Sequence, residues 1–485
     1  MKDQYAFDPK ALESELRELT HGNVPRGFFP WRLYFADVFQ NRGGFDVVIA
    51  NPPYVRQELI RDQKPQLKAT YPDVYHGVAD LYVYFYRRAF DIASPNGTVT
   101  FISSNKYFRA GYGKTLRTFL REKAELNLII DFGDLPIFDA TTYPSVVIAT
   151  NCVPDLKHHT ARVVNVRDME KLDSLPDFLA EVGWKQPQRS LLKDGWALEH
   201  ADVLALVEKL KASGTPLGEY VEGRVFRGIV TGCNEAFVID QATRDHLNAE
   251  DPRSAEIIKP WLRGKDVKRW RVEWNTLYVL FTRRGIEIEN YPAVLEHLEQ
   301  YRERLEPRPP DWDTSKHGHW RGRKTGSYKW YEIQDAIDYY DQFEKPKIIY
   351  PDISLQPQFT YETTGSYLVN TLYFIPSPRV ELLGLLNSAV VHFFVHFLTA
   401  SIQNSYLRFF SQYVAQIPVP MEAEGASELR EITERLLALG STHSQKLQLE
   451  SELDRFVFGM YCMSTKEIEL VSKTLEAPGL ASGER

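Results

Sequence analysis

Residues 45–58 read FDVVIANPPYVRQE, an apolar run that stops at an asparagine, two prolines and a tyrosine. The run predicts a buried strand over residues 45–50. Pro52 and Pro53 cannot continue a hydrogen-bonded ladder, because proline fixes its φ angle and has no N–H to donate. The carbonyl groups of this turn are therefore free to face a ligand.

The turn offers hydrogen-bond acceptors and an aromatic ring, but no charge. The side-chain oxygen of Asn51 and the carbonyl of Pro52 can together accept both hydrogens of one exocyclic amine. Tyr54 can stack on a flat ring. A strand that simply ends in a stiff turn is the plainer interpretation. The combination of strand, Asn-Pro-Pro and aromatic residue favours a receptor for an aromatic amine.

The segments that follow alternate between apolar strands and amphipathic helices. Their spacing predicts helices over residues 80–93 and 113–124, and strands over residues 98–104, 126–132 and 145–150. Such alternation is typical of an α/β fold with a mostly parallel sheet. Ligands bind such sheets at the carboxyl ends of the strands, which is where Asn51 is expected to lie.

The texture of the sequence changes further along. LKHHTARVVNV at residues 156–166 predicts an additional edge strand. From about residue 215, short apolar runs alternate with basic, aromatic and proline-rich loops, which indicates a mixed α+β domain. Helical periodicity after residue 421 predicts a C-terminal pair of helices. We expect a first α/β domain, a connector, a second domain and a helical segment, at residues 1–165, 166–214, 215–420 and 421–485.

The composition is that of a globular chain. Of its 485 residues, 43% are hydrophobic and 25% are charged, and the net charge is -7. Cys152, Cys233 and Cys462 have no metal-binding spacing, so we expect no metal. No apolar signal segment opens the sequence. The apolar stretch from Leu382 includes an Asn, a Ser and two His, which predicts a buried helix rather than a membrane span. We expect a cytoplasmic protein.

Four segments, in order, resemble the amino-methyltransferases that modify adenine N6 in DNA. They are FDVVIANPPY at residues 45–54, ADLYVYFYRRAF at 79–90, GTVTFISSNKYFRAGYGKTLRTFL at 97–120 and LIIDFGDLPIFDATTYPSVVIAT at 128–150. Residues 30–420 as a whole resemble the methyltransferase part of prokaryotic Type IIG restriction-modification enzymes, followed by a TaqI-like C-terminal specificity domain.

This resemblance implies a site-specific DNA methyltransferase that moves a methyl group from S-adenosylmethionine to an adenine flipped out of the double helix. Asp80, where helix 80–93 begins, is a weak candidate for the cofactor, and an N-cap of that helix is an equally good interpretation. Asp131-Phe132-Gly133 matches the kinase magnesium motif, but no other kinase motif precedes it, so we interpret it as a strand end. The implied catalytic residues are Asn51, Pro52, Pro53 and Tyr54, and the implied target-base residues are Phe138, Tyr143, Asn105 and Lys106. For Phe138 and Tyr143, core packing is an equally good interpretation.

The sequence departs from the family in one respect. Family members bind S-adenosylmethionine with a Gly-rich loop upstream of the Asn-Pro-Pro-Tyr motif, and residues 1–50 contain no such loop. We therefore expect an N-terminally truncated, partial Rossmann-like class I methyltransferase sheet, without its first strands, that exposes an edge and an apolar face. A second polypeptide would supply the cofactor-binding half and any nuclease.

Basic residues cluster twice in the second domain, with aromatic residues among them. Such clusters suit phosphate and base contacts in double-stranded DNA, although a solvated basic loop is the plainer interpretation. KPKIIYPDIS at residues 345–354 and YLVNTLYFI at residues 367–375 also resemble the TaqI-like specificity domain. The candidate DNA-binding residues are Lys259, Arg263, Lys265, Lys268, Arg269, Arg321, Arg323 and Lys324.

Other interpretations stay open. Without a cofactor loop, the chain could be a DNA-recognition subunit that does not catalyse, or an inactive remnant. Asn-Pro-Pro-Tyr also serves methyltransferases that act on glutamine amides, but the large second domain with its two basic clusters favours DNA.

Overall fold

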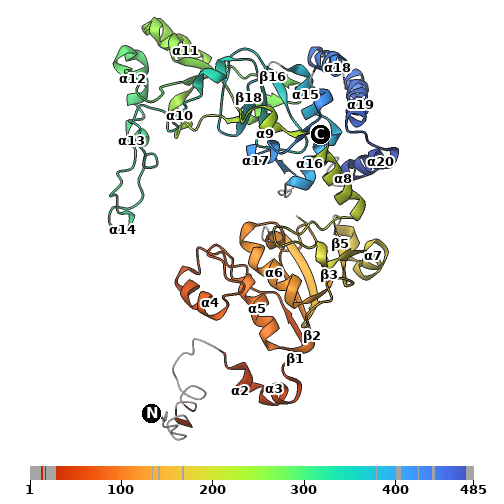
Figure 1. Ribbon diagram of the computed structural model, residues 1–485. Coiled ribbons are helices and arrows are strands. Elements are labelled where there is room, and N and C mark those ends of the chain that lie inside the picture. Colours follow the sequence, from red (N-terminus) through yellow and green to blue (C-terminus); the bar gives the residue numbers. More distant parts are fainter. Residues whose placement is uncertain are drawn as a thin grey trace, which may run out of the picture. The chain divides into compact units, whose positions relative to one another are not determined.

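The computed structural model forms two compact units that divide between Leu198 and Glu199 (Figure 1). The residues of the expected connector are shared between the units. Strand β6 (Trp184–Pro187) belongs to the sheet of the first unit, and helix α8 (Ala201–Ala212) belongs to the second. The division into four parts stays a prediction. The structure describes residues 13–14, 17, 29–133, 135–139, 142–166, 169–377, 379–399, 406–423, 425–439 and 443–476.

The first unit is an α/β fold built on one sheet with the strand order β1-β2-β4-β3-β5-β6. β1 pairs with β2 and β3 with β5 in parallel, while β4 lies antiparallel between β2 and β3. β1, β2, β3 and β5 therefore run in the same direction. β5 was expected at an edge but lies inside the sheet, because β6 pairs with its outer side. The remaining bounds are β1 (Phe45–Ala50), β2 (Ala93–Ser104), β3 (Glu125–Asp131), β4 (Pro144–Thr150) and β5 (Thr160–Asn165).

Helices pack on both faces of this sheet. The predicted helices are α5 (Tyr82–Ile92) and α6 (Lys114–Lys123), whose buried side chains pack against β2, β3 and β4. Helix α7 (Leu175–Val182) packs on the opposite face, against Ile130 of β3 and Val164 of β5. The shorter helices are α2 (Trp31–Tyr34), α3 (Ala36–Arg42) and α4 (Lys64–Thr70).

β1 was predicted as a buried strand, and only one of its faces is packed. Val48 and Ala50 pack against the core, whereas Val47 is 54% exposed and Ile49 is 74% exposed. β1 pairs only with β2 among the described residues and is therefore the outer strand of the sheet. The expected exposed edge and apolar face are both present.

The second unit combines small sheets with helices. One sheet has the order β16-β14-β18-β8 and another the order β17-β10-β13-β9. Strands β14 (Lys347–Pro351) and β18 (Leu372–Ile375) lie within the apolar segments 345–354 and 367–375, and β13 (Leu277–Leu280) forms on a further apolar run. The other strands are β8 (Phe226–Arg227), β9 (Val238–Asp240), β10 (Ile258–Leu262), β16 (Thr360–Glu362) and β17 (Tyr367–Leu368).

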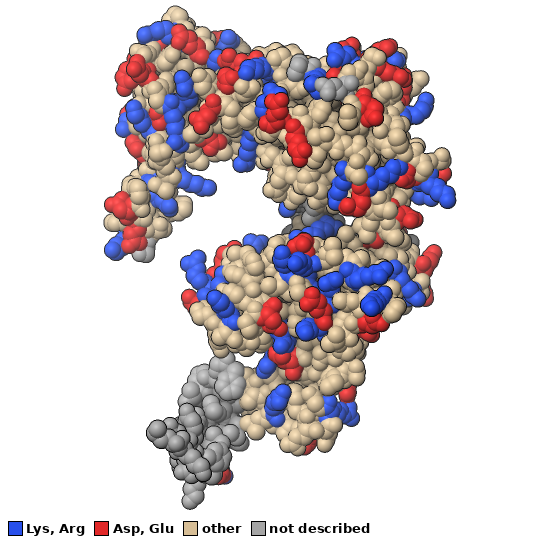
Figure 2. Space-filling model, in the orientation of Figure 1, with Lys and Arg blue, Asp and Glu red and all other residues tan. Residues whose placement is uncertain are grey.

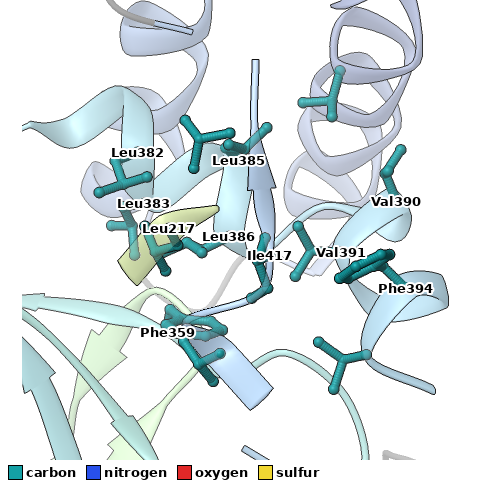
Figure 3. Close-up of a cluster of buried hydrophobic side chains, with 14 of the residues drawn as sticks. Leu217, Phe359, Leu382, Leu383, Leu385, Leu386, Val390, Val391, Phe394 and Ile417 are labelled. Carbon is teal, nitrogen blue, oxygen red and sulfur yellow. The ribbon is translucent and has the colours of Figure 1, made fainter. Parts of the chain in front are cut away.

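A large apolar core holds the C-terminal helices to this unit. Leu382, Leu385 and Phe394 from α15 (Val380–Leu386) and α16 (Ala389–Leu398) lie close to Phe359 and Ile417 (Figure 3). The predicted C-terminal pair of helices is present as the first two helices of this segment, and a third helix follows it. The helices are α18 (Ser427–Ala438), α19 (His443–Met460) and α20 (Thr465–Glu476).

In the described parts of the chain, no single helix has the length and apolarity needed to cross a membrane. Only α15 and α16 taken together would pass by length and composition, and they are bent by 57° relative to each other.

Candidate active site and DNA-contact residues

The carboxyl ends of three strands meet at one edge of the first unit's sheet. β1 leads into Asn51, β2 leads into Asn105, and β3 ends at Asp131. These strands run in the same direction. The side chain of Asn105 donates a hydrogen bond of 2.7 Å from Nδ2 to Oδ1 of Asp131. The sheet therefore gathers polar side chains from distant parts of the sequence next to the Asn-Pro-Pro-Tyr turn.

The turn itself leaves its acceptors accessible. Asn51 and Pro53 are exposed, while Pro52 is buried and fixes the turn against the unit. Outside helices and strands, no backbone hydrogen bond within the described residues ends on the carbonyl of Asn51 or Pro52. The amide oxygen and the neighbouring carbonyl are thus both available to a donor.

Tyr54 and Phe138 provide the aromatic side of this edge. Their ring centroids lie 6.1 Å apart with the planes at 63°, an edge-to-face contact. The hydroxyl of Tyr54 is buried and has no hydrogen-bond partner in the described residues. This burial raises the pKa of Tyr54 above its ordinary value. Two aromatic residues that are far apart in the sequence are thereby brought together beside the amide acceptor.

Lys106 and Tyr143 lie next to Asn105. The backbone N–H of Asn105 donates to the carbonyl of Tyr143 at 2.6 Å, and Nζ of Lys106 is 5.6 Å from the centre of the Tyr143 ring. The predicted target-base residues thus surround the same sheet edge. Their contact with a base stays a prediction.

Asp80 holds the loop that follows the turn. Its Oδ1 accepts a hydrogen bond of 3.0 Å from the backbone N–H of Gln57. Helix α5 has Leu81 at its N-cap and no side-chain cap, so Asp80 does not cap it. Burial raises the pKa of Asp80 above its ordinary value. The described contact is therefore structural, and a role toward a cofactor stays a prediction.

Sequence reasoning missed Asp131 at this edge. Its side chain is 5% exposed, and its Oδ1 accepts bonds from Asn105 and from the backbone N–H of Gly133 at 2.9 Å. The signal was its place at the end of a predicted strand parallel to the strand before Asn51.

The glycine next to helix α6 serves packing and not the binding of S-adenosylmethionine. Gly111 and Gly113 precede helix α6, but a Cβ on Gly113 would lie 2.3 Å from the carbonyl oxygen of Tyr107. Gly113 therefore permits close packing rather than forming a cradle for a ligand.

Arg323 was predicted to contact DNA, and the structure contradicts this. The residue is 4% exposed, and burial lowers its pKa. Its guanidinium donates five hydrogen bonds, each to a backbone carbonyl, so no donor remains for a phosphate. The accepting residues are Leu305, Thr231, Glu332, Lys329 and Trp330.

Three other predicted DNA-binding residues form ion pairs with acidic residues of the same unit. Arg263 binds the carboxylate of the buried Asp266 at 3.1 Å. Arg269 pairs with Glu450 at 3.3 Å and has only 17% of its side chain exposed. The third, Lys259, pairs with Glu344 at 3.0 Å.

The remaining four predicted residues reach solvent. Lys265 and Lys324 are exposed and Lys268 is half-buried. Arg321 is 82% exposed, although it pairs with Glu303 at 3.0 Å. Lys324 and Arg321 belong to a basic arm, residues 306–330, of which helix α14 (Thr314–His317) extends away from the rest of the second unit (Figure 1).

Comparison with known proteins identifies both domains. A model of the Eco57I restriction-modification methylase family matches residues 8–138, and a model of the TaqI-like C-terminal specificity domain matches residues 259–419. The Type II methyltransferase M.XhoI of Xanthomonas vasicola is 28% identical over 395 residues, which cover 78% of this chain and 68% of the relative. M.PaeR7I of Pseudomonas aeruginosa is 28% identical over 448 residues, covering 88% of this chain and 72% of the relative.

A solved structure supports the fold. The Type IIL restriction-modification enzyme MmeI, in complex with DNA, matches with a TM-score of 0.56 and 15% sequence identity. The match covers 89% of this chain, and the chain spans 56% of that structure. The chain therefore combines a segment that matches the Eco57I restriction-modification methylase family with one that matches the TaqI-like C-terminal specificity domain, and along most of its length it is similar to Type II methyltransferases.

Proposed function

We propose that this chain provides the target side of a site-specific DNA methyltransferase that acts on the N6 amine of adenine. The observation that carries the proposal is the Asn-Pro-Pro-Tyr turn at the carboxyl end of β1, with Phe138 6.1 Å from Tyr54. Two neutral acceptors beside two rings match an exocyclic amine on a flat heterocycle. An anionic or aliphatic substrate would leave these groups without a use.

The proposed mechanism follows from the positions of these groups. A stacked adenine cannot reach a protein turn, so the base leaves the double helix. The amide oxygen of Asn51 and the carbonyl of Pro52 accept the two N6 hydrogens, which orients the nitrogen lone pair away from the protein acceptors. Tyr54 and Phe138 contact the ring. Most of the rate enhancement then comes from positioning and from fixed dipoles.

When bound, S-adenosylmethionine would supply a methyl group attached to a positively charged sulfur, which is a good leaving group. We expect its binding residues on a segment that pairs with the free edge of β1, in a companion polypeptide. The unpaired edge and the exposed side chains of Val47 and Ile49 support such a segment, since a further parallel strand would satisfy the edge and a helix would cover the apolar face. Isothermal titration of the purified chain with S-adenosylmethionine tests this, and tight binding by the chain alone would contradict it.

Mapping of N6-methyladenine tests the proposed activity. The full chain is expressed in a bacterial host without adenine methylation, alone and together with the companion polypeptide. We expect methylation at one short DNA sequence, and none with Asn51→Ala, while the affinity for DNA stays within about threefold because phosphate contacts dominate it. Asn127→Ala is the control, because this exposed side chain lies near the start of β3, at the opposite edge of the sheet. If Asn51→Ala lost DNA binding to the same extent as methylation, the assigned role would be contradicted.

A second candidate is a DNA-recognition subunit without catalysis. Residues 1–50 contain no Gly-rich loop upstream of the Asn-Pro-Pro-Tyr motif, which favours this candidate. In that case DNA binding persists, but no methylated adenine appears with or without the companion.

A further inference from the structure

A short loop directly after the Asn-Pro-Pro-Tyr turn presents an apolar side chain to solvent. Leu59 is 78% exposed, and no large hydrophobic side chain in the described part of the first unit is more exposed. Single exposed leucines are common on protein surfaces, so exposure alone assigns no role. A role for Leu59 is indicated by the way its loop is anchored and by the charge of the residues around it.

The loop is held firmly on both sides of Leu59. The backbone N–H of Gln57 donates to Asp80, and the Gln57 side chain accepts a hydrogen bond of 2.5 Å from Lys64. The next residue, Ile60, is 2% exposed and belongs to the core of the unit. Leu59 is thus displayed by a fixed loop, five residues after Tyr54, and has little freedom to fold back.

Cations flank this apolar tip. Arg56 and Arg61 are exposed, and neither makes an ion pair within the described residues. Residues 56–68 contain four Lys or Arg and two Asp or Glu. Lys and Arg side chains gather over the part of the first unit where α4 lies (Figure 2). Such a surface attracts the phosphates on both sides of an opened base step.

We propose that Leu59 is a wedge that enters the DNA base stack at the position which the target base leaves, while Arg56 and Arg61 bind the adjacent phosphates. This inference rests on the proposed function, since it requires a base that leaves the helix. Extruding a base costs stacking and pairing energy, and apolar side chains inserted between base steps are a known way to offset such a cost. Leu59 is therefore a positioning residue: it touches neither the amine nor the methyl donor.

The test measures base extrusion separately from binding. The bound DNA sequence is first recovered from a pool of randomised duplexes selected with the full wild-type chain. Duplexes of that sequence then carry 2-aminopurine in place of each adenine in turn, because this base fluoresces more strongly when it is unstacked. We expect the wild-type chain to raise the fluorescence at one position. Leu59→Ala should lower that rise at least about fivefold, and Leu59→Met should restore most of it.

A second substrate separates a wedge from a simple DNA contact. A mismatch opposite the target weakens pairing, so the base leaves more easily. Leu59→Ala should then recover the fluorescence on the mismatched duplex. The control is Val153→Ala: this side chain is 74% exposed but follows β4, whose carboxyl end lies at the opposite edge of the sheet. Unchanged thermal unfolding confirms that both variants are folded.

The outcomes are distinguishable. If Leu59→Ala matches Val153→Ala on the paired duplex, the wedge is wrong, although adenine extrusion by the wild-type chain still supports the proposed function. If the wild-type chain binds its sequence but raises the fluorescence at no adenine, the proposed function itself is wrong, and the wedge with it.

Discussion

At the residue scale, the guanidinium of Arg323 ties several chain segments together. Because its five donors all end on backbone carbonyls, Arg323→Lys leaves buried acceptors without partners, and a lysine has neither the fork nor the number of donors to replace it. We expect the free energy of unfolding of the second unit to fall by more than about 3 kcal/mol. Urea unfolding followed by tryptophan fluorescence measures this.

Arg321 is the matched control for this substitution. It lies two residues away and is 82% exposed, so Arg321→Ala should change stability by no more than about 0.5 kcal/mol. A cost below about 1 kcal/mol for Arg323→Lys would show that the carbonyls find other donors.

Lys324 should behave in the opposite way to its neighbour Arg323. Its side chain is exposed, so Lys324→Ala should leave stability nearly unchanged but weaken DNA binding. If the ammonium neutralises one phosphate, the slope of log affinity against log salt concentration falls by about one. Binding titrations at several salt concentrations measure the slope, and an unchanged slope would remove Lys324 from the DNA-contact residues.

His392 should make the second unit sensitive to acid. Burial lowers its pKa from the ordinary value to about 3. Below about pH 6.5 the unfolded chain therefore binds a proton at this residue, whereas the folded chain does not. Stability is lost as the pH falls from about 6.5 towards 3. His392→Leu should reduce the loss by up to about 1.4 kcal/mol for each pH unit below 6.5. Urea unfolding at pH 7, 5.5 and 4.5 checks this. If the free energy of unfolding fell equally with pH in both proteins, the prediction would be contradicted.

Asp454 contributes with the opposite sign. Burial raises its pKa to about 6 while its carboxylate accepts the backbone N–H of Ala389 at 2.7 Å. The folded chain retains this proton where the unfolded chain has lost it. Its contribution to stability therefore decreases as the pH rises from about 4 to 6. The stability of Asp454→Asn, measured relative to the wild-type protein, should therefore be greater at pH 7 than at pH 4. Urea unfolding of both proteins at the two pH values measures this difference.

At the scale of elements, helix α19 is part of the second unit's core. Leu453 is fully buried on this helix, whereas Leu447 is 54% exposed on the same helix. Leu453→Ala should lower the free energy of unfolding by about 2–5 kcal/mol, through lost burial and the cavity left behind. Leu447→Ala provides the control, with a change of at most about 0.5 kcal/mol. Equal effects would mean that α19 is not docked as described.

The sequence predicted the bounds of individual strands better than it predicted how those strands pair and pack. β1 spans the predicted residues 45–50, since its bounds follow from local apolar pattern and two prolines. The packing of only one face of β1, and the internal place of β5, depend on which strands pair, and no local pattern contains that information. Arg323 was assigned to a phosphate for the same reason: its partner Thr231 lies 92 residues away in the sequence.

At the scale of the whole molecule, each unit has its own core. Every cluster of buried apolar side chains draws its residues from a single unit. Residues 199–485 expressed alone should therefore unfold in one cooperative transition. Coincident urea curves from tryptophan fluorescence and circular dichroism would support this. A gradual loss of signal, without a transition, would contradict an independent second unit.

The base of the basic arm has a consequence for how the protein can diverge. Backbone hydrogen bonds between Arg323 and Glu306 and between Arg308 and Arg323 close the arm, and the buried guanidinium anchors that closure. For a chain closed at its base, doubling the number of residues costs only about 0.6 kcal/mol of entropy. Insertions and deletions between residues 309 and 322 should thus be tolerated, so the arm forms a cassette whose tip can change length and composition while the rest of the domain stays folded.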